Sequence, residues 1–352
     1  MRGVTFLGDI SLNDWYVDAW RDGLQPFQGV VEELQNSQFV IGNLECLAEG
    51  DQGENKQKVP RLKTTKETLT FLKDINLSLV TLAHNHVYDN LEDGFEKTVG
   101  YLDEMGIQHI GAGATQEMAS EGKIISIDGV TIGFLNYVTK NTNPHIPDEA
   151  AIKVNWYDLD KIQADISNLK KKVDQIVVLL HWGGDYEGGY YPNTVQSSEA
   201  REMIDYGADL IVGHHSHTLQ PYEIYKGKYI FHSLGNFCFS NIPKYGYEVD
   251  RKKATHSIML HIRFTKESYR VEKTPIQNND GYIVIDQSIL GKLEKRRRHY
   301  QTLKNSCLLW HHYHFTQKYI YPVGYYFFGN NRNPWSQLKK LQLQKVVYYF
   351  TR

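Results

Sequence analysis

Residues Gly207–Phe239, GADLIVGHHSHTLQPYEIYKGKYIFHSLGNFCF, form the most informative part of the sequence. It contains two short apolar runs, Asp209–Val212 and Tyr229–His232, each of a length that predicts a buried strand. The first run leads into a histidine-rich segment, Gly213–His217, and the second leads into Ser233–Asn236. The stretch therefore predicts two strands, each followed at its carboxyl end by polar residues.

Outward from this stretch, strand and helix patterns alternate along the chain. The other predicted strands are Val4–Leu7, Phe39–Ile41, Leu77–Leu82, Lys123–Ile127, Val130–Tyr137 and Ile176–Leu180. The predicted helices are Thr65–Lys73, Gly94–Met105, Leu159–Val173 and Ser197–Tyr206. Asp128-Gly129 is a hairpin turn signal between two of the strands. This order predicts an α/β fold, with the strands packed centrally and the helices outside.

Composition and charge divide the chain into an acidic body and a basic tail. Of the 352 residues, 41% are hydrophobic and 23% are charged, which excludes wholesale disorder. The net charge of −2 combines −13 in residues 1–290 with +11 in Gly291–Arg352. The alternation of strands and helices stops near Asp286–Leu293. We therefore expect an α/β body at residues 1–288 and a basic, aromatic, helical C-terminal extension at 289–352.

Targeting signals and cysteines indicate the compartment. Cys46, Cys238 and Cys307 are widely spaced and form no CxxC motif, which fits a reducing compartment better than a disulfide framework. The chain opens with a strand pattern rather than a signal peptide, and no apolar run reaches the ~18 residues of a membrane-spanning helix. These features predict a cytoplasmic protein, with peripheral association at the inner face of the membrane as the alternative.

Polar side chains follow the carboxyl ends of five predicted strands. They are Asp9, Glu45, the pair Asn85 and His86, His181, and the pair His215 and His217. In open α/β sheets this edge carries the ligand crevice, so the side chains can converge. Carboxylate, amide and imidazole ligands without thiolate suit Mn²⁺, Fe²⁺, Zn²⁺ or Mg²⁺. The sequence predicts a site for one or two divalent metal ions.

Each of these residues also has an ordinary structural explanation. Asp9 taken alone could cap a helix or turn, and His181 could be a hydrogen-bonded core histidine. His215 and His217 are more specific, because side chains two residues apart on an extended segment face the same side. The shared strand-end position of all the residues favours the metal site.

Several sequence strings resemble the CapA family of poly-γ-glutamate and capsule biosynthesis proteins. They include FLGDISL, IGNLECLAE, LAHNHVYDN, GAGATQEMA, LLHWGGDY and the block Gly207–Phe239, and together they cover residues 3–245. That family resembles the calcineurin-like metallophosphoesterases. The resemblance implies a four-layer α-β-β-α sandwich, two mixed sheets packed face to face, with a two-metal site on the strand-end loops.

The resemblance also implies a role for each site residue. Asp9 and His217 would hold the first metal, and Glu45 would bridge the two ions. The second metal would be held by Asn85, His181 and His215. His86 would stand beside the scissile group as a catalytic residue, together with Glu45, rather than as a ligand.

The chain departs from the family pattern at four places. His84, Asp89-Asn90-Leu91 and Asp185 replace residues that are usual in the family, and Ser11 stands where phosphoesterases place a metal-binding histidine. The first metal would therefore have one protein ligand fewer. For substrate binding we expect Asp185 and the loop residues Arg61 and Lys63, which could clamp an anion; the alternative is that these are solvated loop charges.

These features predict a metal-dependent hydrolase, of a phosphoester, in capsule or cell-envelope polymer metabolism, with an anionic small molecule or polymer as substrate. The alternatives are a non-hydrolytic component of a capsule or poly-γ-glutamate assembly complex, and amide hydrolysis at the same centre.

The tail leaves its partner open. Leu338, Leu341 and Val346 lie among lysines, a pattern typical of a basic amphipathic helix. Such a tail can dock on the acidic body, lie on an anionic membrane or contact the capsule machinery. A nucleic-acid partner is not expected, because the chain carries no motif of a nucleic-acid-binding fold.

Overall fold

The computed structural model describes residues 2–184, 187–329 and 334, and its strands form two large sheets and one small one. The first large sheet has the order β16 (Tyr282–Ile285), β15 (Tyr269–Asn279), β14 (His256–Phe264), β1 (Arg2–Ile10), β2 (Ser37–Leu44), β3 (Leu77–Thr81) and β4 (Gln108–Ile110), with β13 (Asn236–Cys238) paired to the end of β1. The second has the order β11 (Tyr222–Tyr225), β12 (Lys228–Phe231), β10 (Leu210–His214), β9 (Gln175–His181), β7 (Val130–Val138) and β6 (Lys123–Ile127). The short strands β5 (Ala112–Gly113) and β8 (Lys153–Val154) pair separately.

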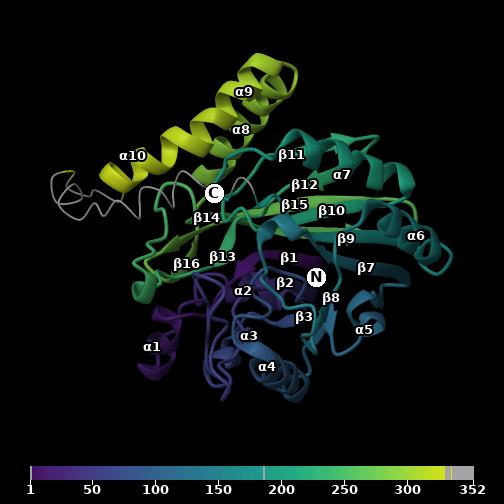
Figure 1. The fold of residues 1–352 in the computed structure, drawn as a ribbon. Coiled ribbons are helices and arrows are strands. Elements are labelled where there is room, and N and C mark those ends of the chain that lie inside the picture. The colour runs from purple at the N-terminus through teal and green to yellow at the C-terminus, as the bar shows by residue number, and fades with distance from the viewer. Residues whose placement is uncertain (1, 185–186, 330–333, 335–352) are drawn as a thin grey trace.

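The two large sheets pack face to face with helices on both outer faces (Figure 1). The core between the sheets joins Phe6 and Ile41 of the first sheet to Phe134 and Val177 of the second. The outer face of the first sheet is covered by α1 (Trp15–Arg21), α2 (Val31–Gln35), α3 (Phe71–Asp74) and α4 (Leu91–Met105). The outer face of the second is covered by α6 (Leu159–Leu169) and α7 (Thr194–Tyr206). The predicted four-layer α-β-β-α architecture is confirmed.

Local sequence signals explain how several of these elements begin and end. Asp128 and Gly129 both have positive φ, 52° and 78°, and form the predicted hairpin turn between β6 and β7. Asn193 and Gln196 form a capping box that fixes the start of α7. The antiparallel strands β14, β15 and β16 were not predicted, although they complete one half of the first sheet.

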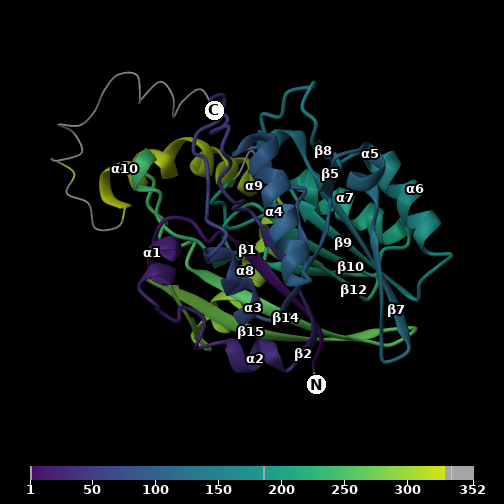
Figure 2. The same cartoon turned by 90° about the horizontal axis from the view of Figure 1, so that it is seen from below.

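The chain continues beyond the sheets into a row of helices, seen from below in Figure 2. These are α8 (Ser288–Lys304), α9 (Cys307–Phe315), the π-helical turn η5 (Thr316–Ile320) and α10 (Tyr321–Phe328). Ile289 and Leu293 of α8 belong to the core between the sheets, so α8 is packed on the body. The boundary at residue 288 stays a prediction, and the predicted helix at Leu338–Val346 lies outside the described residues.

One buried carboxylate joins the tail to the body. Glu223 on β11 is 2% exposed, and it accepts hydrogen bonds from Tyr300 and Lys304 of α8, both at 3.1 Å. Arg201 of α7 pairs with the same carboxylate, and His232 lies 3.3 Å from it. Burial alone would raise the pKa of Glu223, but these donors hold the pKa far below its usual range. Docking on the acidic body, one of the expected roles of the tail, is therefore seen for α8.

Glu223→Gln is expected to lower the free energy of unfolding by roughly 3–5 kcal/mol, because the cations around a buried carboxylate lose their counter-charge. Glu202→Gln on the exposed side of α7 is the control and should change it by less than about 0.5 kcal/mol. Urea unfolding at pH 7 measures both. Equal midpoints for the two variants would show that the Glu223 network does not stabilise the fold.

Candidate metal centre

The predicted ligands lie where parallel strands of both sheets end. Asp9 is near the end of β1, Glu45 directly follows β2, and His181 ends β9. In the second sheet His181 is the register partner of His214, so the segment that follows β10 begins beside the end of β9. The two sheets thus deliver their polar ends to one place.

Two groups of possible ligands share Glu45. Glu45, His181 and His215 form one group and Asp9, Glu45 and His217 the other, and within each group the ligand atoms lie within 4.8 Å of one another. All of these residues are buried. The structure therefore brings together five of the six predicted ligands.

Distances place the sixth residue in the first group. His181 Nε2 lies 3.4 Å from Glu45 Oε1, 3.1 Å from His215 Nδ1 and 2.9 Å from Asn85 Oδ1. In the second group His217 Nδ1 lies 3.5 Å from Asp9 Oδ2 and 3.7 Å from Glu45 Oε2. This division matches the one implied by the resemblance, with Asn85 on one side, Asp9 and His217 on the other, and Glu45 between them.

The residues present fit a divalent metal ion. Both carboxylate oxygens of Glu45 and Nε2 of His215 are buried and have no hydrogen-bond partner among the described residues. Burying such polar atoms costs free energy unless a hydrogen-bond partner or a bound ion interacts with them. Oxygen and imidazole donors around them form a set that Mn²⁺, Fe²⁺ or Zn²⁺ accepts. The roles of the individual ligands stay predictions.

The electrostatics of the cluster point the same way. Burial, with a further contribution from Glu45, raises the pKa of Asp9 to about 8, and burial raises the pKa of Glu45 well above its usual value. Burial also lowers the pKa of His215 to about 3 and the pKa of His181 well below its usual value. Without a cation the cluster therefore favours protonated carboxyls and neutral imidazoles. A bound cation would reverse the preference of the carboxyls, and neutral imidazoles are already able to bind it.

Divalent-metal affinity is expected to rise by about tenfold per pH unit between pH 6 and pH 8, because binding must displace the proton that Asp9 holds up to its pKa of about 8. The raised pKa of Asp9 also makes the stability of the metal-free protein depend on pH. The protonated Asp9 carboxyl contributes its full free energy to folding below the unfolded pKa of 3.8, and this contribution is lost as the pH rises through about 8. Calorimetric titration in two buffers of different ionisation enthalpy measures the released proton. An affinity that is flat over this range would show that Asp9 does not bind the ion.

The turn that presents the two histidines is strained. His215 and His217 have φ values of 91° and 54°, in the left-handed region that non-glycine residues rarely adopt. Such a conformation costs about 1–3 kcal/mol per residue. Surrounding contacts hold it: the His215 amide donates to Asp9 Oδ2 at 3.2 Å, and His217 Nδ1 lies 2.8 Å from Asn236 Oδ1.

Two asparagines that were not predicted as site residues orient the ligands. Asn43 donates to Asp9 Oδ1 at 2.8 Å and lies 3.3 Å from His181 Nδ1, while Thr81 donates to its Oδ1. Asn236 orients His217 through its side-chain oxygen, which accepts from His217 Nδ1 at 2.8 Å. Both asparagines occur at strand ends, in IGNLE and SLGN, so the signal that identified Glu45 also applied to them.

Ser11 takes no part in the cluster. Its hydroxyl donates to Asn13 Oδ1 at 2.7 Å. Among the described residues the second group contains three candidate ligands, Asp9, Glu45 and His217, and the weaker binding expected at this position stays a prediction.

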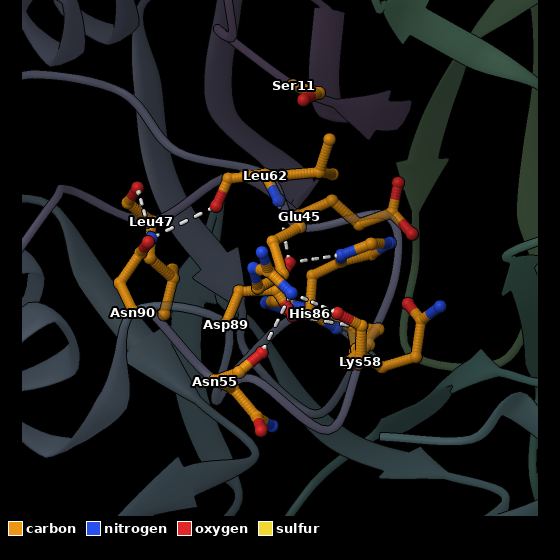
Figure 3. Close-up of polar contacts among 12 residues, drawn as sticks. Ser11, Glu45, Leu47, Asn55, Lys58, Leu62, His86, Asp89 and Asn90 are labelled. Atoms are coloured by element: carbon orange, nitrogen blue, oxygen red, sulfur yellow. Dashed lines mark hydrogen bonds and ion pairs between the residues drawn. The ribbon is translucent and has the colours of Figure 1, made fainter. Parts of the chain in front are cut away.

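His86 is held by a buried carboxylate rather than by the cluster (Figure 3). Its Nδ1 lies 2.5 Å from Asp89 Oδ2, which also accepts a hydrogen bond from the Leu62 amide at 2.7 Å. Burial lowers the pKa of His86, while the Asp89 charge opposes the shift. The other oxygen of Asp89 is 3.2 Å from Lys58 Nζ, and Lys58 also donates to the Asn85 carbonyl. Lys58 thus connects the backbone of a predicted ligand to the carboxylate that orients His86.

The predicted substrate-binding residues lie elsewhere. Arg61 pairs with Glu54 at 2.9 Å, and Lys63 pairs with Glu49 at 3.2 Å; no described contact joins either one to the metal cluster. Lys63 does line a cavity of about 800 Å³ that reaches Phe239, whose ring centroid is 4.9 Å from that of His217. Asp185 lies outside the described residues. Their substrate-binding roles stay predictions.

Lys58 was missed by the sequence analysis. It lies in the same loop as Arg61 and Lys63, and nothing in the local sequence distinguishes it from them. Its distinguishing property is burial, because its side chain is only 6% exposed. That property arises from tertiary packing.

Comparison with known proteins places this geometry in a family. The family model described as bacterial capsule synthesis protein PGA_cap matches residues 3–241. The chain is 33% identical to the PGA biosynthesis protein CapA of Bacillus subtilis over 79% of this chain and 72% of that protein. It is 29% identical to the capsule biosynthesis protein CapA of Bacillus anthracis over 80% of this chain and 67% of that protein.

A solved structure is similar in fold. It is a protein of Staphylococcus aureus assigned as a 5′-nucleotidase, in complex with α-ketoglutarate, with a TM-score of 0.50 and 14% sequence identity over 85% of this chain and 58% of that one.

Within the described residues, every helix is too short or too polar to cross a membrane. From the strand-end motifs, the four-layer sandwich and the match over residues 3–241, we conclude that the chain belongs to the PGA_cap family of bacterial capsule synthesis proteins, which includes CapA.

Proposed function

We propose that this chain is a divalent-metal-dependent hydrolase that cleaves a phosphoester in capsule or poly-γ-glutamate metabolism. The observation that carries the proposal is Glu45, a buried carboxylate that two ligand groups share and whose oxygens accept no hydrogen bond from the described residues. A carboxylate between two groups of imidazole and oxygen donors is suited to bridging two ions. Asp9, Asn85, His181, His215 and His217 would complete their protein ligands.

Divalent ions bound there would neutralise phosphoryl oxygens and lower the pKa of a bound water from 15.7 toward about 7. The protein residues supply orientation and proton transfer. Asp89 accepts from His86 Nδ1, so Nε2 can donate a proton to the departing oxygen when the ring is protonated, a state that the Asp89 charge favours and burial opposes. Asn43 and Asn236 hold Asp9 and His217 in place.

Lys58 would be the basic group of the site, in the loop where Arg61 and Lys63 were expected to serve. Its ammonium group lies against Asp89 and the Asn85 carbonyl. It therefore fixes the spacing between a predicted ligand and the proton donor, and it adds positive charge where an anionic substrate would bind.

A non-hydrolytic role in capsule assembly is the second candidate. The names of the Bacillus relatives favour it, because both describe biosynthesis rather than hydrolysis. In that role the same ions would bind carboxylates of the polymer without bond cleavage.

One experiment separates the two functions. Metal content of the purified protein is measured first, followed by turnover of phosphomonoesters and phosphodiesters with added Mn²⁺. The hydrolase proposal predicts bound metal and turnover that a chelator abolishes and Mn²⁺ restores. Full metal occupancy with no turnover on either class would overturn phosphoester hydrolysis and favour the assembly role.

A further inference from the structure

The segment Glu187–Tyr191 lies between the metal centre and the C-terminal helices. On its inner side, the Gly188 amide donates to the carbonyl of Ser216 at 2.8 Å, and Ser216 stands between His215 and His217. Glu187 Oε1 lies 3.8 Å from His217 Nε2. This side of the segment therefore contacts the turn that presents the two histidines.

On its outer side, the segment contacts the C-terminal helices. The Tyr191 amide donates to the Tyr313 hydroxyl at 3.0 Å, and the Tyr191 hydroxyl lies 2.8 Å from His299 Nδ1. The Tyr191 ring stacks on Tyr300 of α8, with centroids 6.0 Å apart and planes at 7°. Tyr300 and Trp310 are buried in the same apolar cluster as Tyr191.

Lys253 connects the two sides. Its ammonium group donates to the Gly188 carbonyl and to Gln317 Oε1 of η5, both at 3.0 Å. It also lies over the rings of Tyr190 and Tyr321. A continuous path of contacts thus runs from η5 through Lys253 and Gly188 to the turn at Ser216.

Contacts from outside, rather than local preference, fix the conformation of this segment. It contains two glycines in succession, and Gly188 has a φ of 75°, so the isolated segment would sample many conformations. Its backbone groups are satisfied by distant residues: Ser216 and Lys253 bind Gly188, Gln220 binds Gly189, and Tyr313 binds Tyr191. Loss of the outer contacts would release the inner ones as well.

We propose that α8, α9 and η5 are a positioning element for the metal centre, because they fix Gly188–Tyr191 and so hold the Glu187 carboxylate beside His217. This proposal rests on the proposed function, since it assigns Glu187 to the same centre. A carboxylate at this distance supports His217 and adds negative charge that favours a divalent cation. Neither Glu187 nor the helices were among the predicted site residues.

Tyr313→Phe removes the acceptor of the Tyr191 amide and leaves the ring in place. Tyr319→Phe makes the same chemical change in η5, where the Tyr319 ring contacts Phe315 and Lys318 and has no described contact with the segment. Full-length wild type and both variants are compared by hydrogen exchange of residues 187–191 and by Mn²⁺ titration. Tyr313→Phe should speed exchange and weaken Mn²⁺ binding by about tenfold, as loss of groups that orient ligands does, and Tyr319→Phe should do neither.

Glu187→Gln and Glu187→Asp then test the carboxylate itself. Glu187→Gln should weaken Mn²⁺ binding by about tenfold, Glu187→Asp should restore part of it, and neither should change the melting temperature of the metal-free protein, because Glu187 is 45% exposed. A purely structural role would not distinguish the two variants by metal affinity.

Three results would overturn the proposal or part of it. Equal exchange in Tyr313→Phe and Tyr319→Phe would show that the helices do not hold the segment. Faster exchange with unchanged Mn²⁺ affinity would show that the segment does not position the centre. Absence of Mn²⁺ binding by the wild type would overturn the proposed function and with it the role of Glu187, and the exchange comparison would still decide whether the helices fix the segment.

Discussion

Glu45→Gln is expected to weaken divalent-metal binding by at least about 100-fold, because it removes the charge that both ligand groups share. The same substitution should raise the melting temperature of the metal-free protein. Glu45 is fully buried, its oxygens have no hydrogen-bond partner among the described residues, and at neutral pH an amide is buried without the cost of protonating the carboxylate. Calorimetry and thermal melts, with and without Mn²⁺, measure the two opposite effects.

The control for this variant is Glu49→Gln. Glu49 is more than half exposed and pairs with Lys63, so its charge lies outside the cluster. It should leave metal affinity and melting temperature unchanged. If Glu45→Gln retains wild-type metal affinity, Glu45 does not bridge the ions and the proposed centre is wrong.

His86→Ala is expected to lower turnover by about 10²–10⁴-fold while metal content stays at the wild-type level, since a positioned acid or base contributes in this range. The structure supports the separation, because His86 contacts Asp89 and belongs to neither ligand group. Turnover at saturating substrate and elemental analysis of the same sample measure both quantities.

Asn85→Ala is the neighbouring comparison for His86→Ala. Asn85 Oδ1 lies 2.9 Å from His181 Nε2, so its loss should reduce metal content as well as turnover. Equal loss of metal in both variants would identify His86 as a ligand. Equal turnover of His86→Ala and wild type, with metal bound, would exclude His86 from the reaction.

Much of the centre could be predicted from strand-end positions. Parallel strands place their carboxyl ends at one edge, so Asp9, Glu45 and His181 follow from apolar runs that end in polar residues. The resemblance to the CapA family then implied which predicted ligands would hold each of the two metal ions. In the structure, His181 lies near Glu45 and His217 lies near Asp9, which is the same grouping. The α/β fold and the four layers were predictable for the same reasons.

The remaining site features depend on contacts between segments far apart in the chain. Lys58 differs from Arg61 and Lys63 only in its tertiary burial, which a loop sequence does not encode. The charge count predicted attraction between tail and body, but it could not identify Glu223 as the residue that binds α8. It also gave no indication that Tyr313 reaches the segment beside His217.

The packing of α8 has a consequence for synthesis of the protein. Ile289 and Leu293 complete the core between the two sheets, and Glu223 gains Tyr300 and Lys304 only from the same helix. A ribosome adds about 5–20 residues per second from the N-terminus, so every strand is made before these partners exist. The nascent sandwich therefore carries an uncovered apolar face and an incompletely paired carboxylate until α8 leaves the exit tunnel. Chains stalled before Ser288 should be cleaved by protease faster than chains stalled well beyond Lys304, because the packing of α8 follows the synthesis of every described strand.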